Sequence, residues 1–151
     1  MKTSTLAAIW SPVAYLGVRE DFVELKKDYS SERRLELLFT GGFGYRKGAQ
    51  YLIPALETLE KQGTDFRLTV VGDAGEAAGL IESSSLGNRL KCVGFVPQDQ
   101  LKGFLENSDL YVFPSLAEGC ASSGMEAMAA GLPSKTWADC MSFLLLSLNR
   151  R

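Results

Sequence analysis

Residues 35–48 read LELLFTGGFGYRKG, and this stretch decides the fold. Its first six residues are a mostly apolar run that stops at two glycines, as is typical of a strand buried on both faces of a sheet. From Lys47 to Lys61 apolar residues recur at helical spacing, and Gly63 stands where a helix C-terminal cap is expected. The stretch therefore predicts a strand, a glycine-rich loop and an amphipathic helix, in that order.

The same alternation continues toward the C-terminus. Further strands are expected at 66–71, 90–95 and 110–113, and further helices at 76–83, 98–106 and 122–130. Strands and helices that alternate in this way form a parallel sheet with right-handed crossovers and helices on both faces. The fold class is therefore α/β: a Rossmann-like, doubly wound parallel sheet in a three-layer α/β/α arrangement.

Two regions outside this alternation fit it less well. Residues 1–34 contain a possible strand at 13–16 and then a charged stretch, which indicates a connector or an exposed, weakly ordered arm. Residues 134–151 allow a fifth strand near 135–138 but otherwise show no clear period. We therefore expect an N-terminal segment, one Rossmann-like domain over residues 35–133 and an atypical C-terminal tail.

The composition excludes several kinds of chemistry. The 151 residues contain no histidine, which removes imidazole bases, imidazole-activated nucleophiles and most transition-metal sites, so no metal is expected. A net charge of −2, with basic residues only in short groups, disfavours nucleic acid as a partner. Cys92, Cys120 and Cys140 have neither zinc-site nor disulfide-framework spacing. Their pattern favours a cytoplasmic protein, with peripheral attachment to the inner face of a membrane as the alternative.

The glycine-rich loop after the first strand is a candidate phosphate cradle. Glycines let backbone N–H groups approach an anion, a helix N-terminus adds positive potential, and Arg46 and Lys47 supply full charges. The spacing matches neither the dinucleotide-binding fingerprint nor the P-loop. A plain strand-to-helix turn with a solvated first helical turn explains the loop equally well.

The loop after the fourth expected strand carries two acidic residues. Glu118 lies in the loop, and Glu126 follows eight residues later in the next helix. The residues between Gly119 and Gly124 are small, so their N–H groups can face a ligand at the strand ends. Two carboxylates beside an anion cradle point to a phosphorylated sugar. The alternatives are an exposed loop acid at Glu118 and a helix-dipole interaction at Glu126.

Together these residues resemble the group 1 (family 4) glycosyltransferases, which are retaining enzymes of GT-B architecture. The resemblance runs from about Gly17 to Pro133, and its most specific part, from Glu118 to Glu126, is similar to the family's E-x7-E motif. Supporting matches lie at 46–48, 70–73, 93–97 and 108–115. The chain looks like a single, truncated GT-B half: the C-terminal, nucleotide-sugar-binding domain, preceded by a linker-derived segment over residues 1–34.

The resemblance implies a role for each site residue. Lys47, aided by Arg46, contacts the diphosphate, Glu118 binds the sugar hydroxyls, and Glu126 binds the ribose hydroxyls. Gly119, Cys120, Ala121 and Ser122 line the sugar and phosphates, and Phe95 and Val96 flank the base. Lys47 and Glu118 are the expected catalytic residues, because a cation stabilises the departing diphosphate and a carboxylate favours positive charge on the sugar ring. The donor is a nucleotide-diphosphate sugar, and no cofactor is expected.

The sequence also departs from the family pattern. Gly42 replaces an arginine that many relatives carry, and Cys120–Ala121 replaces an aromatic–glycine pair. The closing elements after Pro133 and the N-terminal, acceptor-binding half are not recognised. Two functions stay open: the donor-binding domain of a hexosyltransferase-type enzyme, inactive without the other half, or a non-catalytic nucleotide-binding or protein-interaction module. Exposed apolar surface would also allow a homo-oligomer.

Overall fold

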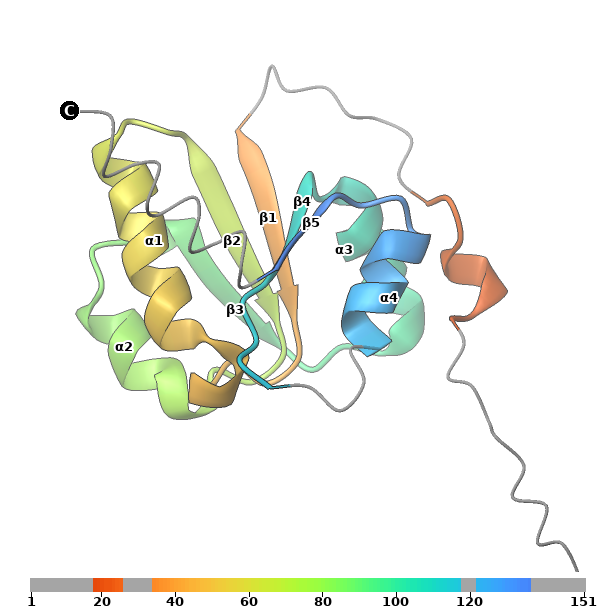
Figure 1. The fold of residues 1–151 in the computed structure, drawn as a ribbon, viewed down its shortest axis with the longest axis horizontal. Coiled ribbons are helices and arrows are strands. Elements are labelled where there is room, and N and C mark those ends of the chain that lie inside the picture. Colours follow the sequence, from red (N-terminus) through yellow and green to blue (C-terminus); the bar gives the residue numbers. More distant parts are fainter. Residues whose placement is uncertain (1–17, 26–33, 118–121, 137–151) are drawn as a thin grey trace, which may run out of the picture.

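The computed structural model describes residues 18–25, 34–117 and 122–136 (Figure 1). Within these ranges, strands and helices alternate along the chain as expected. The strands are β1 (Leu35–Thr40), β2 (Phe66–Val71), β3 (Leu90–Gly94), β4 (Leu110–Phe113) and β5 (Ser134–Thr136). The α-helices are α1 (Ala49–Lys61), α2 (Ala78–Ser83), α3 (Gln98–Asn107) and α4 (Ser122–Ala129). Short 3-10 helices are η1 (Glu20–Phe22), η2 (Tyr45–Lys47), η3 (Gly75–Ala77) and η4 (Gly87–Arg89).

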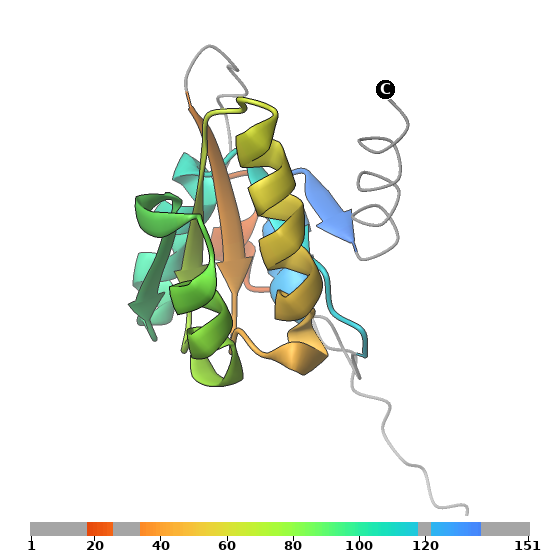
Figure 2. The same cartoon turned by 90° about the vertical axis from the view of Figure 1, so that its left-hand side faces the viewer.

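The strands form one parallel sheet in the order β3-β2-β1-β4-β5. Helices α1 and α2 cover one face and α3 and α4 cover the other (Figure 1), and Figure 2 views the molecule from the α1/α2 side. The expected Rossmann-like, three-layer α/β/α fold is thus confirmed. The chain proceeds from β1 to β2 and β3 on one side and then returns to β4 on the other. A topological switch point therefore lies between the carboxyl ends of β1 and β4.

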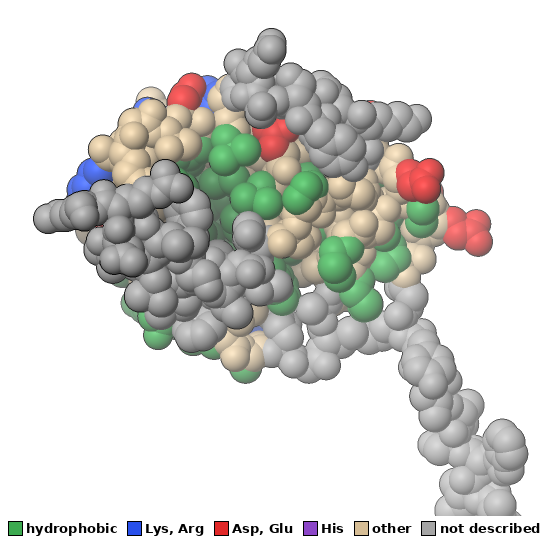
Figure 3. Space-filling view, turned by 45° about the horizontal axis from the view of Figure 1, so that its top comes forward, with side chains coloured by type: hydrophobic (Ala, Val, Ile, Leu, Met, Phe, Trp, Pro, Cys, Tyr) green, Lys and Arg blue, Asp and Glu red, His purple; other side chains and the backbone are tan. Residues whose placement is uncertain are grey.

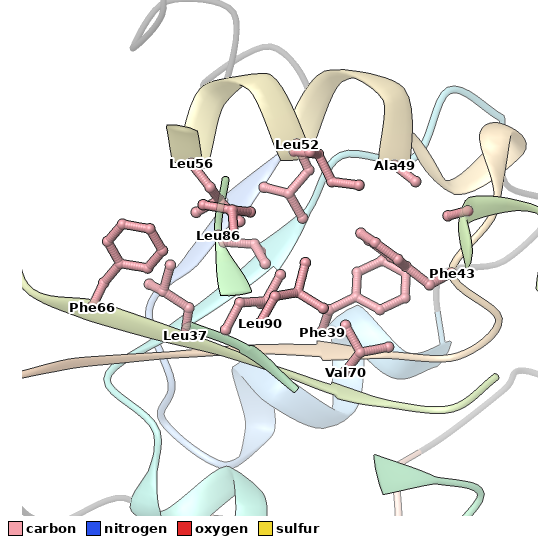
Figure 4. Close-up of a cluster of buried hydrophobic side chains, with 14 residues drawn as sticks. Leu37, Phe39, Phe43, Ala49, Leu52, Leu56, Phe66, Val70, Leu86 and Leu90 are labelled. Atoms are coloured by element: carbon pink, nitrogen blue, oxygen red, sulfur yellow. The ribbon is translucent and has the colours of Figure 1, made fainter. Parts of the chain in front are cut away.

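Both faces of the sheet are packed, as the apolar run at 35–40 predicts. Alternate residues of β1 point to opposite faces, so Leu37 and Phe39 join the cluster under α1, which we call the α1/α2 core (Figure 4). Leu38 points the other way, into a smaller cluster that we call the α3/α4 core. The buried members of the α3/α4 core are Phe22, Leu38, Val71, Leu105, Tyr111, Ala127, Ala130 and Leu132.

The first long helix begins later than the expected start at Lys47. Tyr45–Lys47 is a 3-10 turn, and Gly48 then adopts a left-handed conformation with φ of 81° before α1 begins at Ala49. A left-handed residue interrupts helical geometry, and glycine adopts it without steric penalty. Gly63, with φ of 79°, follows the C-terminal end of α1 as the sequence predicts.

Both ends of the described chain extend the domain beyond residues 35–133. The alternative of an exposed arm is wrong at Phe22, which is fully buried in the α3/α4 core, although residues 19–21, 23 and 24 are exposed. The alternative of a connector stays a prediction. At the other end, β5 pairs in parallel with β4, so the sheet continues past Pro133 into the segment assigned to the tail. The possible strand at 13–16 and residues 137–151 lie outside the described ranges.

Candidate functional site

The carboxyl edge of the sheet holds a cavity at the switch point. We call it the switch-point pocket; its volume is about 300 Å³. Several residues that the sequence assigned to donor binding meet there, although they come from four separate segments: Lys47, Phe95, Val96, Ser122 and Glu126. The pocket is completed by Thr40, Gly41, Val71, Gln98, Leu101 and Ser123.

The remaining predicted residues fall into two groups. Arg46 lines a neighbouring cavity of about 420 Å³, and Lys47 lies on the walls of both cavities. Glu118, Gly119, Cys120 and Ala121 lie outside the described residues. Lys47 and Glu126 thus line one pocket. Their roles in donor binding stay predictions, as does the loop half of the E-x7-E motif.

Lys47 is positioned by contacts between the glycine-rich loop after β1 and the loop after β4, which we call the two ligand loops. The backbone carbonyl of Arg46 accepts a hydrogen bond from the N–H of Leu116 at 3.0 Å, which joins η2 to the loop after β4. Gly48 permits this approach, because a Cβ at this position would overlap the carbonyl oxygen of Pro114. The Nζ of Lys47 lies 5.6 Å from the ring centroid of Phe113, at the end of β4. The cation is thus held over the switch point by the neighbouring strand.

Phe43 anchors the glycine-rich loop to the protein interior. Its side chain is fully buried, and its ring meets that of Phe39 edge to face at a centroid distance of 5.0 Å. Its N–H donates to the carbonyl oxygen of Asp73 at 2.7 Å, which ties the loop to the end of β2. Sequence reasoning noted the glycines and missed this anchor. A large apolar residue between two glycines was the signal available.

The first turns of α4 supply the other wall of the pocket. Ser122 and Ser123 begin the helix, and Glu126 follows one turn later. The N-terminus of a helix carries unpaired N–H groups and positive potential, which attract an anion. Glu126 adds an acceptor for hydroxyl groups next to that anion-binding end. Lys47 and the start of α4 thus line the same pocket.

Tyr111 is a polar residue beneath the pocket that sequence reasoning missed. Its side chain is fully buried, and its hydroxyl lies 2.9 Å from Oγ1 of Thr40. Burial raises the pKa of Tyr111 above its ordinary value, hydrogen bonds with Ser123 and Thr40 act in the opposite direction, and the nearby Glu126 carboxylate raises it further. The phenol therefore stays protonated and links β1, β4 and α4. The sequence signal that could have revealed this residue was a tyrosine within a strand buried on both faces. A buried hydroxyl requires a hydrogen-bond partner, so such a tyrosine indicates a polar contact in the core.

Metal and thiol chemistry find no support in the described ranges. No group of three His, Cys, Asp or Glu residues that could hold a metal ion occurs there. Cys92 is a free, exposed cysteine whose pKa is raised by desolvation and then by the Asp73 carboxylate, so it is not an activated thiolate. Cys120 and Cys140 lie outside the described residues. Across the same ranges, none of the helices has the length and apolar character needed to cross a bilayer.

Exposed apolar side chains are scattered over several elements. Viewed obliquely from the end where β1 begins, the surface shows hydrophobic side chains near its centre and acidic and basic side chains around them (Figure 3). Phe95 is the most exposed large hydrophobic residue described, at 81%, and it lies at the switch-point pocket. The others are Val23, Tyr45, Tyr51, Leu116 and Met128. Self-association through such surface stays a prediction.

Comparison with protein families and curated proteins identifies relatives of the chain. The family model described as "Glycosyl transferases group 1" matches residues 21–136. The amylovoran biosynthesis glycosyltransferase AmsK of Erwinia amylovora is 32% identical over 130 residues, which cover 80% of this chain and 32% of AmsK. The chain thus spans about a third of the length of this curated relative.

Solved structures share the same fold. WaaG, a glycosyltransferase involved in lipopolysaccharide biosynthesis, superposes with a TM-score of 0.63 at 24% identity, over 80% of this chain and 36% of WaaG. The C-terminal domain of LpcC, a group 1 family protein of Francisella tularensis, gives a TM-score of 0.56 at 22% identity, over 68% of this chain and 57% of that domain. At these identities the likeness concerns the architecture of the chain.

Proposed function

Because the chain belongs to the group 1 glycosyl transferases, we propose that it is the donor-binding half of a two-domain sugar transferase. In this proposal the switch-point pocket binds a nucleotide-diphosphate sugar. The observation that carries the proposal is the meeting of a cation, a helix N-terminus and a carboxylate in one pocket: Lys47, Ser122 and Glu126. These groups match the phosphates and hydroxyls of such a donor.

The diphosphate would lie between Lys47 and the first turn of α4. Lys47 lines both cavities at the carboxyl edge, so its ammonium can reach an anion in either one. The N–H groups at the start of α4 face the same space and complete an anion site with no metal. Arg46, on the wall of the neighbouring cavity, supplies a second cation close to Lys47.

The nucleoside would occupy the part of the pocket away from Lys47. The Glu126 carboxylate can accept hydrogen bonds from the two ribose hydroxyls. A phosphate group has the same negative charge as this carboxylate and would be repelled by it. The exposed ring of Phe95 and the side chain of Val96 offer an apolar surface for a base. The pocket thus provides a charged region and an apolar region, as a nucleotide requires.

Catalysis in this proposal is leaving-group stabilisation. When the bond between the anomeric carbon and the diphosphate oxygen breaks, the electron pair stays on the diphosphate, and Lys47 and the α4 dipole stabilise the growing charge. Glu118, from the E-x7-E motif, would hold the sugar and favour positive charge on its ring. The acceptor hydroxyl then bonds through its oxygen to the same face of the sugar, with retention, and its proton passes to the departing diphosphate.

The acceptor would be bound by a second domain. The chain covers 32% of AmsK, so a whole enzyme of this kind contains a large part that is not represented here. We expect no transfer by the described domain until an acceptor-binding half is supplied. The alternative, a non-catalytic nucleotide-binding module, is favoured by Gly42, which lies on the cavity wall where many relatives are expected to carry an arginine.

Isothermal titration calorimetry with UDP, GDP, ADP and their glucose conjugates tests the proposal. Lys47→Ala should weaken binding of every nucleotide by at least about tenfold, because a charge-assisted hydrogen bond contributes about 1.5–3 kcal/mol. Glu126→Gln should weaken binding to a lesser extent. Lys61→Ala, on the exposed end of α1, is the matched control. Absence of any nucleotide binding at millimolar concentration would refute the donor-site assignment.

Glu118→Gln separates the two functions. A donor-binding transferase half should bind the sugar conjugate more tightly than the bare nucleotide, and this difference should disappear in Glu118→Gln. A non-catalytic module should bind both ligands equally before and after the substitution.

A further inference from the structure

Gln98 is a polar residue in the apolar part of the switch-point pocket. It is the first residue of α3 and lines the pocket together with Phe95, Val96 and Leu101. Its side-chain oxygen, Oε1, accepts a hydrogen bond from Nη1 of Arg19 at 2.9 Å. The two residues lie 79 positions apart in the chain, so the fold brings this pair together.

Arg19 is itself held in a defined orientation. Its Nε and Nη2 donate to the two carboxylate oxygens of Asp21 at 3.0 and 2.6 Å, a bidentate pairing. Its guanidinium carbon lies 5.8 Å from the ring centroid of Phe22, which is anchored in the α3/α4 core. Lys102 of α3 also pairs with Asp21, which ties the segment to the helix that begins at Gln98. The third guanidinium nitrogen therefore points at Gln98 from a supported position.

This pairing determines which end of the Gln98 amide can serve a ligand. A guanidinium group can only donate hydrogen bonds, so Arg19 holds Oε1 toward itself. The amide nitrogen, Nε2, is then the polar group that Gln98 can offer to the pocket, and it can only donate. Without Arg19 the amide could rotate by half a turn and offer either a donor or an acceptor.

We propose that the Arg19–Gln98 pair sets the base preference of the pocket. The proposal rests on the proposed function, namely that a nucleotide occupies this pocket. A fixed amide donor favours a base that presents a carbonyl acceptor, such as uracil through O4 or guanine through O6. At the position of these carbonyl oxygens adenine carries its N6 amino group, which is a donor. It cannot pair there with the donor Nε2 of Gln98. The pocket should therefore prefer a uridine or guanosine diphosphate over adenosine diphosphate.

The experiment compares UDP, GDP and ADP by isothermal titration calorimetry with the chain and its variants. The unmodified protein should bind UDP or GDP about 2- to 10-fold more tightly than ADP, the range expected for one hydrogen bond at an exposed position. Gln98→Glu replaces the donor with an acceptor and should remove or invert that ratio. Arg19→Ala frees the amide and should bring the ratio toward one with a smaller change in the affinity for the preferred nucleotide.

Two controls distinguish this inference from the proposed function. Lys61→Ala removes a cation at the exposed end of α1 and leaves Arg19, Asp21 and Gln98 untouched, so the ratio should not change. Lys47→Ala should lower the affinity for all three nucleotides by the same factor. If the unmodified protein binds the three nucleotides equally, or if Gln98→Glu weakens all of them equally, the inference is wrong and the proposed function stands. If no nucleotide binds, both are wrong.

Discussion

The two faces of the sheet are packed with different chemistry. The α1/α2 core consists of apolar side chains, among them Phe39, Leu56 and Leu68. The α3/α4 core contains the buried Tyr111, whose hydroxyl pairs with Thr40, and its rim carries the ion pairs of Asp21. The two helices that cover this second face, α3 and α4, supply five of the eleven residues that line the pocket. One face therefore supplies stability by burial, and the other combines burial with the polar groups that a ligand needs.

The largest expected effect lies in the α1/α2 core. Leu68, at the centre of β2, is fully buried in that cluster. Leu68→Ala should lower the free energy of unfolding by about 2–5 kcal/mol, because it removes buried methyl groups and leaves a cavity. Urea denaturation measures this change. Nucleotide affinity of the folded fraction should stay the same, and a loss of affinity would show that the two faces are not separate in function.

Gly48 tests the place where the two ligand loops meet. Gly48 and Gly63 have nearly equal φ angles of 81° and 79°, but a Cβ would overlap Pro114 only at Gly48, since nothing lies within 4 Å at Gly63. Gly63→Ala should cost about 1–2 kcal/mol from backbone strain. Gly48→Ala should cost more and should also weaken nucleotide binding, because the loops must separate beside Lys47. Equal losses of stability in thermal denaturation, with unchanged binding, would contradict the docked-loop arrangement.

Tyr111 tests the polar layer of the α3/α4 core. Tyr111→Phe leaves Thr40 without its partner at 2.9 Å and removes the link to Ser123, so the free energy of unfolding should fall by about 1 kcal/mol. Because Ser123 and Glu126 line the pocket, nucleotide affinity should fall as well. Urea denaturation measures the change in stability, and calorimetry measures the change in nucleotide affinity. A variant that loses stability but keeps full affinity would assign Tyr111 to packing alone.

The smallest effect concerns the charged rim of the α3/α4 core. The hydrogen bond from Lys102, together with Arg19, holds the pKa of Asp21 below its ordinary value of 3.8, against an opposing effect of desolvation. A carboxyl whose pKa is lower in the folded state stabilises the protein above its unfolded pKa, and this contribution is lost as the pH falls through the folded pKa. Asp21→Asn should therefore be slightly less stable at pH 7, and denaturation curves should show this difference shrinking as the pH is lowered below 3.8.

Local patterns were sufficient for most secondary structure and for part of the site. The apolar run at 35–40 became β1, and Gly63 ended α1 as expected. The prediction of an exposed arm was wrong at Phe22, which is buried. A single aromatic residue in a charged stretch gives no repeating apolar pattern that would indicate burial. The start of α1 shifted because Gly48 is left-handed, and its close approach to Pro114, which is distant in the chain, is not visible in the local sequence. Tyr111 was missed because its partner Thr40 lies 71 residues away.

The sequence by itself determined the α/β alternation, the two ligand loops and the spacing of Glu118 and Glu126, because each depends on residues close together in the chain. Tertiary structure alone decided which of these groups meet. The order β3-β2-β1-β4-β5 brings the ends of β1 and β4 together, so that Lys47 and Glu126 line one pocket. The same packing joins Arg19 to Gln98. Such contacts depend on strand order and register, which local periodicity does not encode.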